Sequence, residues 1–213
     1  SHDLRPPLAA VKAAVSSLRS DDVGFSPEDT AELLATVEES TDQLTALGGN
    51  LLDSSRLAAG VVSPQLRRVY LEEAVPRALL GIGRDTLDRV KVDVGDTVVY
   101  ADSGLLERVL ANVLDNALRY APDAPVRVTA GRLGDRVLIA VADEGPGVPG
   151  GADLFAPFQR LGDHDTRTGV GLGLSVARGF VEAMGGTITS TDTPGGGLTI
   201  EIDLPAPTPG AQP

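Results

Sequence analysis

Apolar residues recur every three or four positions in the first part of the chain. One series is Leu4, Leu8, Val11, Val15 and Leu18; the other is Leu33, Val37, Leu44, Leu47 and Leu51, with Ser40 at the one polar position of the repeat. This spacing places each series on one face of a helix. Ser26 followed by Pro27 is a typical helix start. The pattern predicts two helices joined by a polar connection within residues 20–27.

Two such helices form a hairpin that leaves part of its apolar stripe uncovered. Pairing with a second copy into a four-helix bundle would cover it, so we expect a homodimer through residues 1–60. The alternative is that the hairpin packs on the rest of its own chain. Gly48 and Gly49 lie inside the second helix, and each glycine should weaken it by about 1 kcal/mol.

Beyond a linker at residues 60–64, strand-like and helix-like segments are mixed without strict alternation. The predicted strands are Val90–Val94, Val98–Ala101, Val126–Ala130, Val137–Ala142, Thr187–Ser190 and Leu198–Leu204, and the predicted helices are Leu71–Leu80, Ser103–Tyr120 and Gly171–Met184. Several strands alternate apolar and polar residues, which favours a sheet with one buried face. We therefore expect an α+β sandwich over residues 65–205, followed by a disordered Pro-rich tail at residues 206–213.

Composition excludes several classes of function. The chain has 213 residues, no cysteine and a formal net charge of −12. The absence of cysteine excludes disulfides and thiolate metal sites. The negative charge argues against a nucleic-acid partner and against binding to an anionic membrane surface. Crossing a bilayer takes about 18 apolar residues in a row, and the chain contains no such run. Any membrane attachment would therefore come from segments of a parent protein.

The predicted helix at residues 103–120 carries Asn112 and Asn116 four positions apart, and therefore on one face. Amide oxygens at this spacing suit Mg²⁺, which binds a few protein oxygens together with phosphates and water. Arg119 and Tyr120 follow and could reach a phosphate and a base. Taken alone, two asparagines on a helix are more often ordinary surface residues.

Asp143 stands at the end of an apolar strand and is followed by Gly145 and Gly147. A carboxylate in this place can accept the exocyclic amine of adenine, while the glycines let the backbone approach the ring. As an isolated pattern it is a turn.

Gly169, Gly171 and Gly173 lead into a helix, whose free N–H groups favour phosphate. A dinucleotide-binding fold needs a preceding strand, but residues 160–168 are polar, and no Walker A loop is present. Phe155 and Phe158 lie between the second and third motifs. We expect their rings to anchor residues 159–168, which have the composition of a lid.

In this order the motifs resemble the N, G1, F and G2 boxes of the ATP-binding domain of sensor histidine kinases, within the wider family of gyrase, Hsp90 and MutL. Residues 1–8, Ser-His-Asp-Leu-Arg-Pro-Pro-Leu, resemble the H box of their dimerisation hairpin. The resemblance covers residues 1–205. The amino-acid sequence within the motifs is similar to that of Kdp-type potassium-responsive kinases. The resemblance implies a Bergerat-type sandwich that binds ATP and Mg²⁺. It also implies that the hairpin is N-terminally truncated here.

The resemblance assigns a role to each matching residue. His2 would be the phosphoacceptor and Asp3 the acid that takes its proton. Asn116 would be the main Mg²⁺ ligand, with Asn112 beside it. The nucleotide would be bound by Arg119, Tyr120, Asp143, Gly145, Gly147, Arg160, Gly169, Gly171, Gly173 and Leu174, with Asp143 reading adenine. The family's Thr or Asn four residues after the acceptor is replaced by Pro6, which predicts weak phosphatase activity.

The implied reaction is ATP-dependent autophosphorylation of His2, followed by transfer to an aspartate of a response regulator. The resemblance further implies the cytoplasmic part of a membrane-anchored sensor, with potassium or osmotic stress as its signal. One alternative is an ATP-binding fragment or regulator without kinase activity. Another is a serine-kinase anti-sigma factor of the same nucleotide fold, against which the hairpin of residues 1–60 argues.

Overall fold

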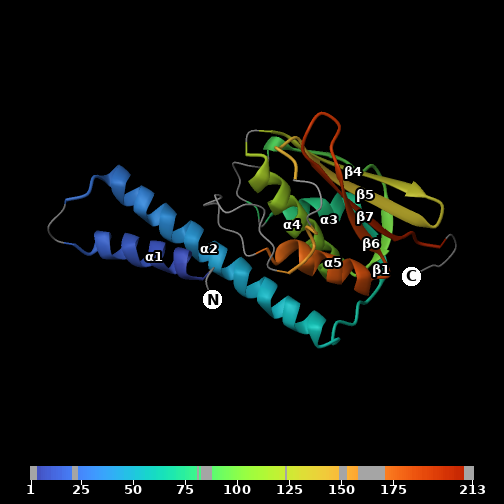
Figure 1. Ribbon diagram of the computed structural model, residues 1–213, viewed down its shortest axis with the longest axis horizontal. Helices are drawn as coiled ribbons and strands as arrows, with labels where there is room; N and C mark the ends of the chain where they lie inside the picture. Colours follow the sequence, from blue (N-terminus) through green and yellow to red (C-terminus); the bar gives the residue numbers. More distant parts are fainter. Residues whose placement is uncertain are drawn as a thin grey trace.

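The computed structural model describes residues 4–20, 24–80, 82, 88–122, 124–148, 153–157 and 171–208. Its N-terminal part is the predicted hairpin of α1 (Arg5–Leu18) and α2 (Pro27–Ala58). The two helices lie side by side, and α2 extends past α1 along the rest of the molecule (Figure 1). The start of α2 is a capping box, because Ser26 and Asp29 each accept a hydrogen bond from the other's backbone N–H.

The end of α2 is equally well defined. Gly60 has φ +65° and donates its N–H to the carbonyl of Leu57, while Val61 donates to that of Arg56. These two bonds form a Schellman motif, which requires a left-handed residue that glycine supplies without strain. The hairpin therefore stops at Gly60.

The remainder of the described chain forms two sheets and three helices. The elements are β1 (Arg67–Tyr70), α3 (Leu71–Leu79), β2 (Val90–Asp93), β3 (Val98–Ala101), α4 (Ser103–Tyr120), β4 (Val126–Leu133), β5 (Arg136–Asp143), α5 (Gly173–Ala183), β6 (Thr187–Asp192) and β7 (Leu198–Pro205). The larger sheet has the order β2-β4-β5-β7-β6, with β2 parallel to β4 and the other pairs antiparallel. The helices cover one of its faces (Figure 1).

Burial alternates along the central strands, as the sequence predicts. Ile139 and Val141 on β5 pair with Ile202 and Ile200 on β7, and all four are at most 2% exposed. Their side chains belong to the same core as the buried residues of α4 and α5. Burying a side chain of this size contributes roughly 1.5–3 kcal/mol. The predicted α+β sandwich is confirmed, with one face of the sheet buried.

One strand is missing from the prediction. Strand β1 is four residues long, includes Arg67 and Arg68, and buries only Val69. It pairs antiparallel with β3 in a separate two-stranded sheet, with Val69 opposite Val99. So short a segment with a single buried side chain lacks the alternation that identifies strands.

The chain beyond β7 begins with anchored residues. The N–H of Ala206 donates to the carbonyl of Asp135 at 2.7 Å, and the carbonyl of Pro207 accepts from Arg132. Residues 209–213 of the predicted disordered tail lie outside the described residues. The bounds of the two domains, at residues 1–60 and 65–205, stay a prediction. Among the described helices, none combines the length and apolarity needed to span a bilayer.

Candidate nucleotide-binding site

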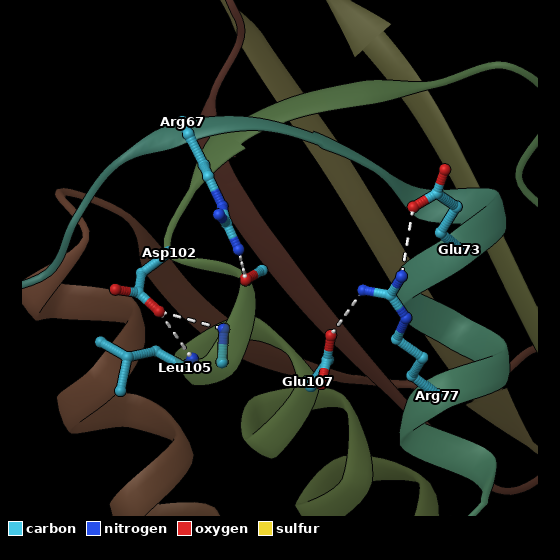
Figure 2. Close-up of polar contacts among 8 residues, drawn as sticks. Arg67, Glu73, Arg77, Asp102, Leu105 and Glu107 are labelled. Atoms are coloured by element: carbon cyan, nitrogen blue, oxygen red, sulfur yellow. Dashed lines mark hydrogen bonds and ion pairs between the residues drawn. The ribbon is translucent and has the colours of Figure 1, made fainter.

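Helix α4 positions the first motif, and Asp102 fixes where that helix begins. Its carboxylate accepts hydrogen bonds from the N–H groups of Gly104 and Leu105, at 3.0 and 3.1 Å (Figure 2). The N–H of Gln65, in the segment that leaves the hairpin, also donates to it, at 2.9 Å. Burial alone would raise the pKa of Asp102. These three backbone bonds and the charge of Arg67 outweigh burial, so the pKa lies below its usual range.

Further polar contacts fix α4 against its neighbours. Arg77 on α3 bridges Glu73 on its own helix and Glu107 on α4, at 3.4 Å each (Figure 2). Arg67 on β1 donates to the hydroxyl of Ser103. The first turn of α4 is thus tied to α3, to β1 and to the connection from the hairpin.

Asn112 and Asn116 lie half-buried on α4, between the core and solvent. Their neighbours Val113 and Leu114 are completely buried, which sets the rotation of the helix. The side chain of Asn112 meets the start of α5, because a Cβ added to Gly173 would lie 3.3 Å from its Oδ1. The first and third motifs therefore adjoin each other.

The start of α5 has the properties of an anion site. Gly171 has φ +66°, and Leu172 and Leu174 are buried, which holds the first turn in place. Within the described residues, no side chain caps the first N–H groups of this helix. Free N–H groups at a helix start favour phosphate. A glycine at position 173 leaves the space beside Asn112 open.

Asp143 ends β5 as a buried carboxylate, 4% exposed. Its Oδ1 accepts from the N–H of Gly145 at 2.9 Å and from the N–H of Leu198 at 3.2 Å. Because these bonds come from two segments, the carboxylate is held in one orientation. A carboxylate can accept about four hydrogen bonds, so it retains capacity for an amine of a ligand.

The turn after Asp143 rests on the end of α4. A Cβ on Gly145 would lie 2.9 Å from the carbonyl oxygen of Tyr120 and 3.2 Å from Cβ of Ala121. Gly147 has φ +73° and lies against Gly197. Only glycine allows this approach, so the second motif is packed directly on the helix that carries the first.

These contacts bring the first motif on α4 next to the second and the third.

Residues 101–208 match the family model "Histidine kinase-, DNA gyrase B-, and HSP90-like ATPase", and residues 1–60 match "His Kinase A (phospho-acceptor) domain". "Sensor protein KdpD" of Mycobacterium tuberculosis H37Rv is 75% identical over 97% of this chain. The chain belongs to the histidine kinase family, and it is similar to the Kdp-type sensor kinases.

Solved structures of histidine kinases share this fold. Acinetobacter baumannii histidine kinase AdeS shares the fold with a TM-score of 0.73 at 24% identity, covering 98% of this chain and 99% of that one. Full-length ShkA in complex with AMPPNP has a TM-score of 0.67 at 26% identity, covering 97% of this chain and 44% of that one. This histidine kinase chain spans about a quarter of the length of the KdpD relative, covering 25% of it.

Several of the assigned residues lie outside the described part of the histidine kinase. They are His2, Asp3, Arg160 and Gly169, together with Phe158. Phe155 is described and buried, at 7% exposed, with the guanidinium of Arg178 6.0 Å from its ring centroid. Arg178 also pairs with Asp153 at 3.6 Å. The first aromatic of its motif is thus anchored on α5.

In the last turns of α4, the residue assigned to phosphate is paired with a carboxylate of its own helix. Arg119, assigned to phosphate, forms an ion pair with Asp115 at 2.6 Å. Both side chains are partly exposed, so a surface pair of this kind is weak and exchangeable. The phosphate role of Arg119 stays a prediction, as does the base-contacting role of Tyr120.

Two residues that support the site belong to none of the sequence motifs, and the sequence analysis did not identify them. Asp102 is one, although an Asp-Ser pair before an apolar helix is a known N-cap signal. Gly197 is another, with φ +106° and no room for a side chain against the carbonyl of Asp143. Its signal is the run Gly195-Gly196-Gly197, which occurs once in the chain.

Proposed function

We propose that the chain binds ATP with Mg²⁺, phosphorylates His2 and passes the phosphoryl group to an aspartate of a response regulator. The observation that carries the proposal is the meeting of three motifs around α4. Gly145 rests on the end of this helix, and Gly173 rests on Asn112. Membership of the histidine kinases supports the same reading.

The residues present fit the nucleotide and its metal ion. Asn116 and Asn112 offer neutral amide oxygens on one face, and the glycine at position 173 keeps the space beside Asn112 open. Oxygen ligands of this kind would hold Mg²⁺, which neutralises phosphate charge when bound. Asp143 would accept the adenine amine, and the first turn of α5 would donate its N–H groups to phosphate.

The transfer step follows from the assigned residues. A ring nitrogen of His2 attacks the γ-phosphorus, the bond from phosphorus to the β,γ-bridging oxygen breaks, and ADP leaves. Asp3 takes the proton that the imidazole loses. A neutral imidazole is nucleophilic near pH 7, and the barrier falls mainly through positioning and charge neutralisation.

Partners and setting follow from the family. We propose a homodimer through the hairpin, where Leu8 and Val15 on α1 and Leu51 on α2 remain exposed in the single chain. The response regulator is the second partner. We further propose that the chain is the cytoplasmic part of a membrane-anchored sensor of potassium or osmotic stress, in keeping with its Kdp-type relatives.

Incubation with γ-labelled ATP and Mg²⁺ tests the reaction. Acid-labile, alkali-stable label is expected on the protein and should vanish in His2→Gln. The matched control is His164→Gln, since these are the two histidines of the chain, and it should keep its label. Acid-stable label would instead indicate a serine kinase.

Calorimetry tests the site separately from the transfer. Asp143→Asn should weaken Mg·ATP binding, because an amide presents an N–H₂ group where the adenine amine needs an acceptor. Nucleotide binding without any label would favour a non-catalytic ATP-binding module. Absence of nucleotide uptake by the unaltered protein would contradict the whole proposal.

A further inference from the structure

Arg89, directly before β2, reaches the far end of α4. Its guanidinium donates to the carbonyl oxygen of Ala121 and, at 3.1 Å, to that of Ala124. The side chain is half-buried. A residue outside every motif therefore contacts the helix that carries Asn112 and Asn116.

The end of α4 has few backbone donors of its own, and the carbonyl of Ala121 accepts one backbone bond, from the N–H of Ala124 at 3.3 Å. The last carbonyls of a helix have no intrahelical donors, and many helices end in a left-handed glycine that supplies them. Here Ala121 leaves the helix at φ −122°, ψ 65°, and Pro122 follows it. Proline has no N–H to offer. Nη2 of Arg89 donates both of its hydrogen bonds here, and the guanidinium places a positive charge at the negative end of the helix dipole.

Two walls of the nucleotide site meet at this same point. The last turn of α4 carries Asn116 and Tyr120. The turn after Asp143 sits on it, with Gly145 against the carbonyl of Tyr120 and Cβ of Ala121. A shift of Ala121 would therefore move the metal-side asparagine and the adenine-side turn relative to each other.

We infer that Arg89 is a positioning residue for the nucleotide: it holds the end of α4 against the Asp143–Gly147 turn. The inference rests on the proposed function, because it takes Asn116 and Asp143 as the groups that bind Mg·ATP. Arg89 itself contacts neither of these side chains in any described interaction.

Arg132 provides a matched control. It too donates to two backbone carbonyls, those of Gly134 at 2.9 Å and Pro207 at 3.3 Å. It lies opposite Val137, at the end of β5 away from Asp143. Val137 and Asp143 are six positions apart on β5, or about 20 Å. Loss of Arg132 therefore removes the same kind of interaction far from the site.

The experiment compares the unaltered protein with Arg89→Met, Arg89→Lys and Arg132→Met. The Kd of Mg·ATP is measured by calorimetry, and KM and kcat for autophosphorylation are measured in parallel. Circular dichroism first fixes a temperature at which all four proteins are folded. Arg89→Met should raise both Kd and KM about tenfold, the effect of roughly 1.4 kcal/mol, with a smaller change in kcat. Arg89→Lys, which keeps the positive charge and a donor nitrogen on a different stem, should recover part of the affinity.

Arg132→Met should keep its Kd within about twofold even if it lowers Tm as much as Arg89→Met does. Amide hydrogen exchange gives a second readout, since protection in the last turn of α4 should fall in Arg89→Met alone. Equal Kd values for Arg89→Met and Arg132→Met would overturn the inference. Failure of the unaltered protein to bind Mg·ATP would instead overturn the proposed function.

Discussion

Asp53 on α2 forms an ion pair with Arg108 on α4, and this pair joins the hairpin to the ATP-binding domain. The carboxylate is 3% exposed, so it is removed from water and depends on its partner. Close by, Leu57 on α2 packs against Gly179 on α5, where an added Cβ would lie 2.6 Å from Cδ1 of the leucine. An ionic and an apolar contact thus hold one side of α2 to the domain.

Arg108→Met should release the domain from α2. The change leaves the Asp53 carboxylate buried without its counter-charge, which costs about 3 kcal/mol unless the two parts separate. Urea unfolding should show the loss, and limited proteolysis should cut faster within residues 61–64. Arg77→Met is the control, because its pairs are exposed and worth less than about 1 kcal/mol. Identical cleavage of both variants would contradict a joining role for this pair.

The adjacent glycines of α2 should respond differently to alanine. Gly48 is exposed, and a Cβ there meets nothing within 4 Å among the described residues. Gly48→Ala should therefore raise the free energy of unfolding by about 1 kcal/mol through helix propensity. A Cβ on Gly49 would lie 3.3 Å from Nη2 of Arg108. Gly49→Ala should raise the free energy of unfolding clearly less than Gly48→Ala does. Equal increases in urea unfolding would show that the Arg108 side chain moves aside without cost.

Gly197→Ala should damage the adenine side of the site. Its φ of +106° is strained for alanine, and the new Cβ would clash with the carbonyl of Asp143. Backbone strain of this kind costs on the order of 1–3 kcal/mol, and Asp143 must shift. We expect lower stability together with weaker Mg·ATP binding.

Gly195→Ala serves as the control for that variant. Gly195 has a similar φ of +96°, but a Cβ there meets no described neighbour within 4 Å. It should lose stability through strain alone and bind nucleotide normally. Equal nucleotide affinities for the two alanine variants would argue against a role for the close approach at Gly197.

Asp102 should contribute to the pH dependence of stability. Its pKa is lower in the folded protein than in the unfolded chain, so its contribution is complete above the unfolded value, about pH 4, and disappears as pH falls through the folded value. Asp102→Asn should lose stability near pH 7 and show a shallower decline below about pH 4. Urea unfolding between pH 3 and pH 7 measures both curves. Parallel curves would exclude this linkage.

Local patterns predicted most of the elements because they report local geometry. The heptad spacing predicted both helices of the hairpin, and the apolar alternation at residues 198–204 predicted β7. The roles that the family resemblance assigns to the site residues stay predictions. Strand β1 escaped because it buries one side chain and depends on β3 for its partner.

The supporting contacts could not be predicted from spacing. Arg89 and Ala121, Asp53 and Arg108, and Asp143 and Gly197 are each far apart along the chain. Periodicity says which face of an element is buried, but not which residue of another element meets it. Some residue types indicate a close contact, such as a glycine pair inside a helix, but they do not identify the residue on the other side of that contact.

The bonds at Gly60 and Gln65 mark the two ends of the connection between the hairpin and the ATP-binding domain. The Schellman motif closes α2 at Gly60, and Gln65 is tied to the carboxylate that starts α4. The four residues between them, Val61 to Pro64, are the covalent connection between the hairpin and the ATP-binding domain, beside the contacts that α2 makes with α4 and α5. A rotation of α2 would therefore reach α4 by two routes, through this short connection to Asp102 and through the ion pair of Asp53 with Arg108.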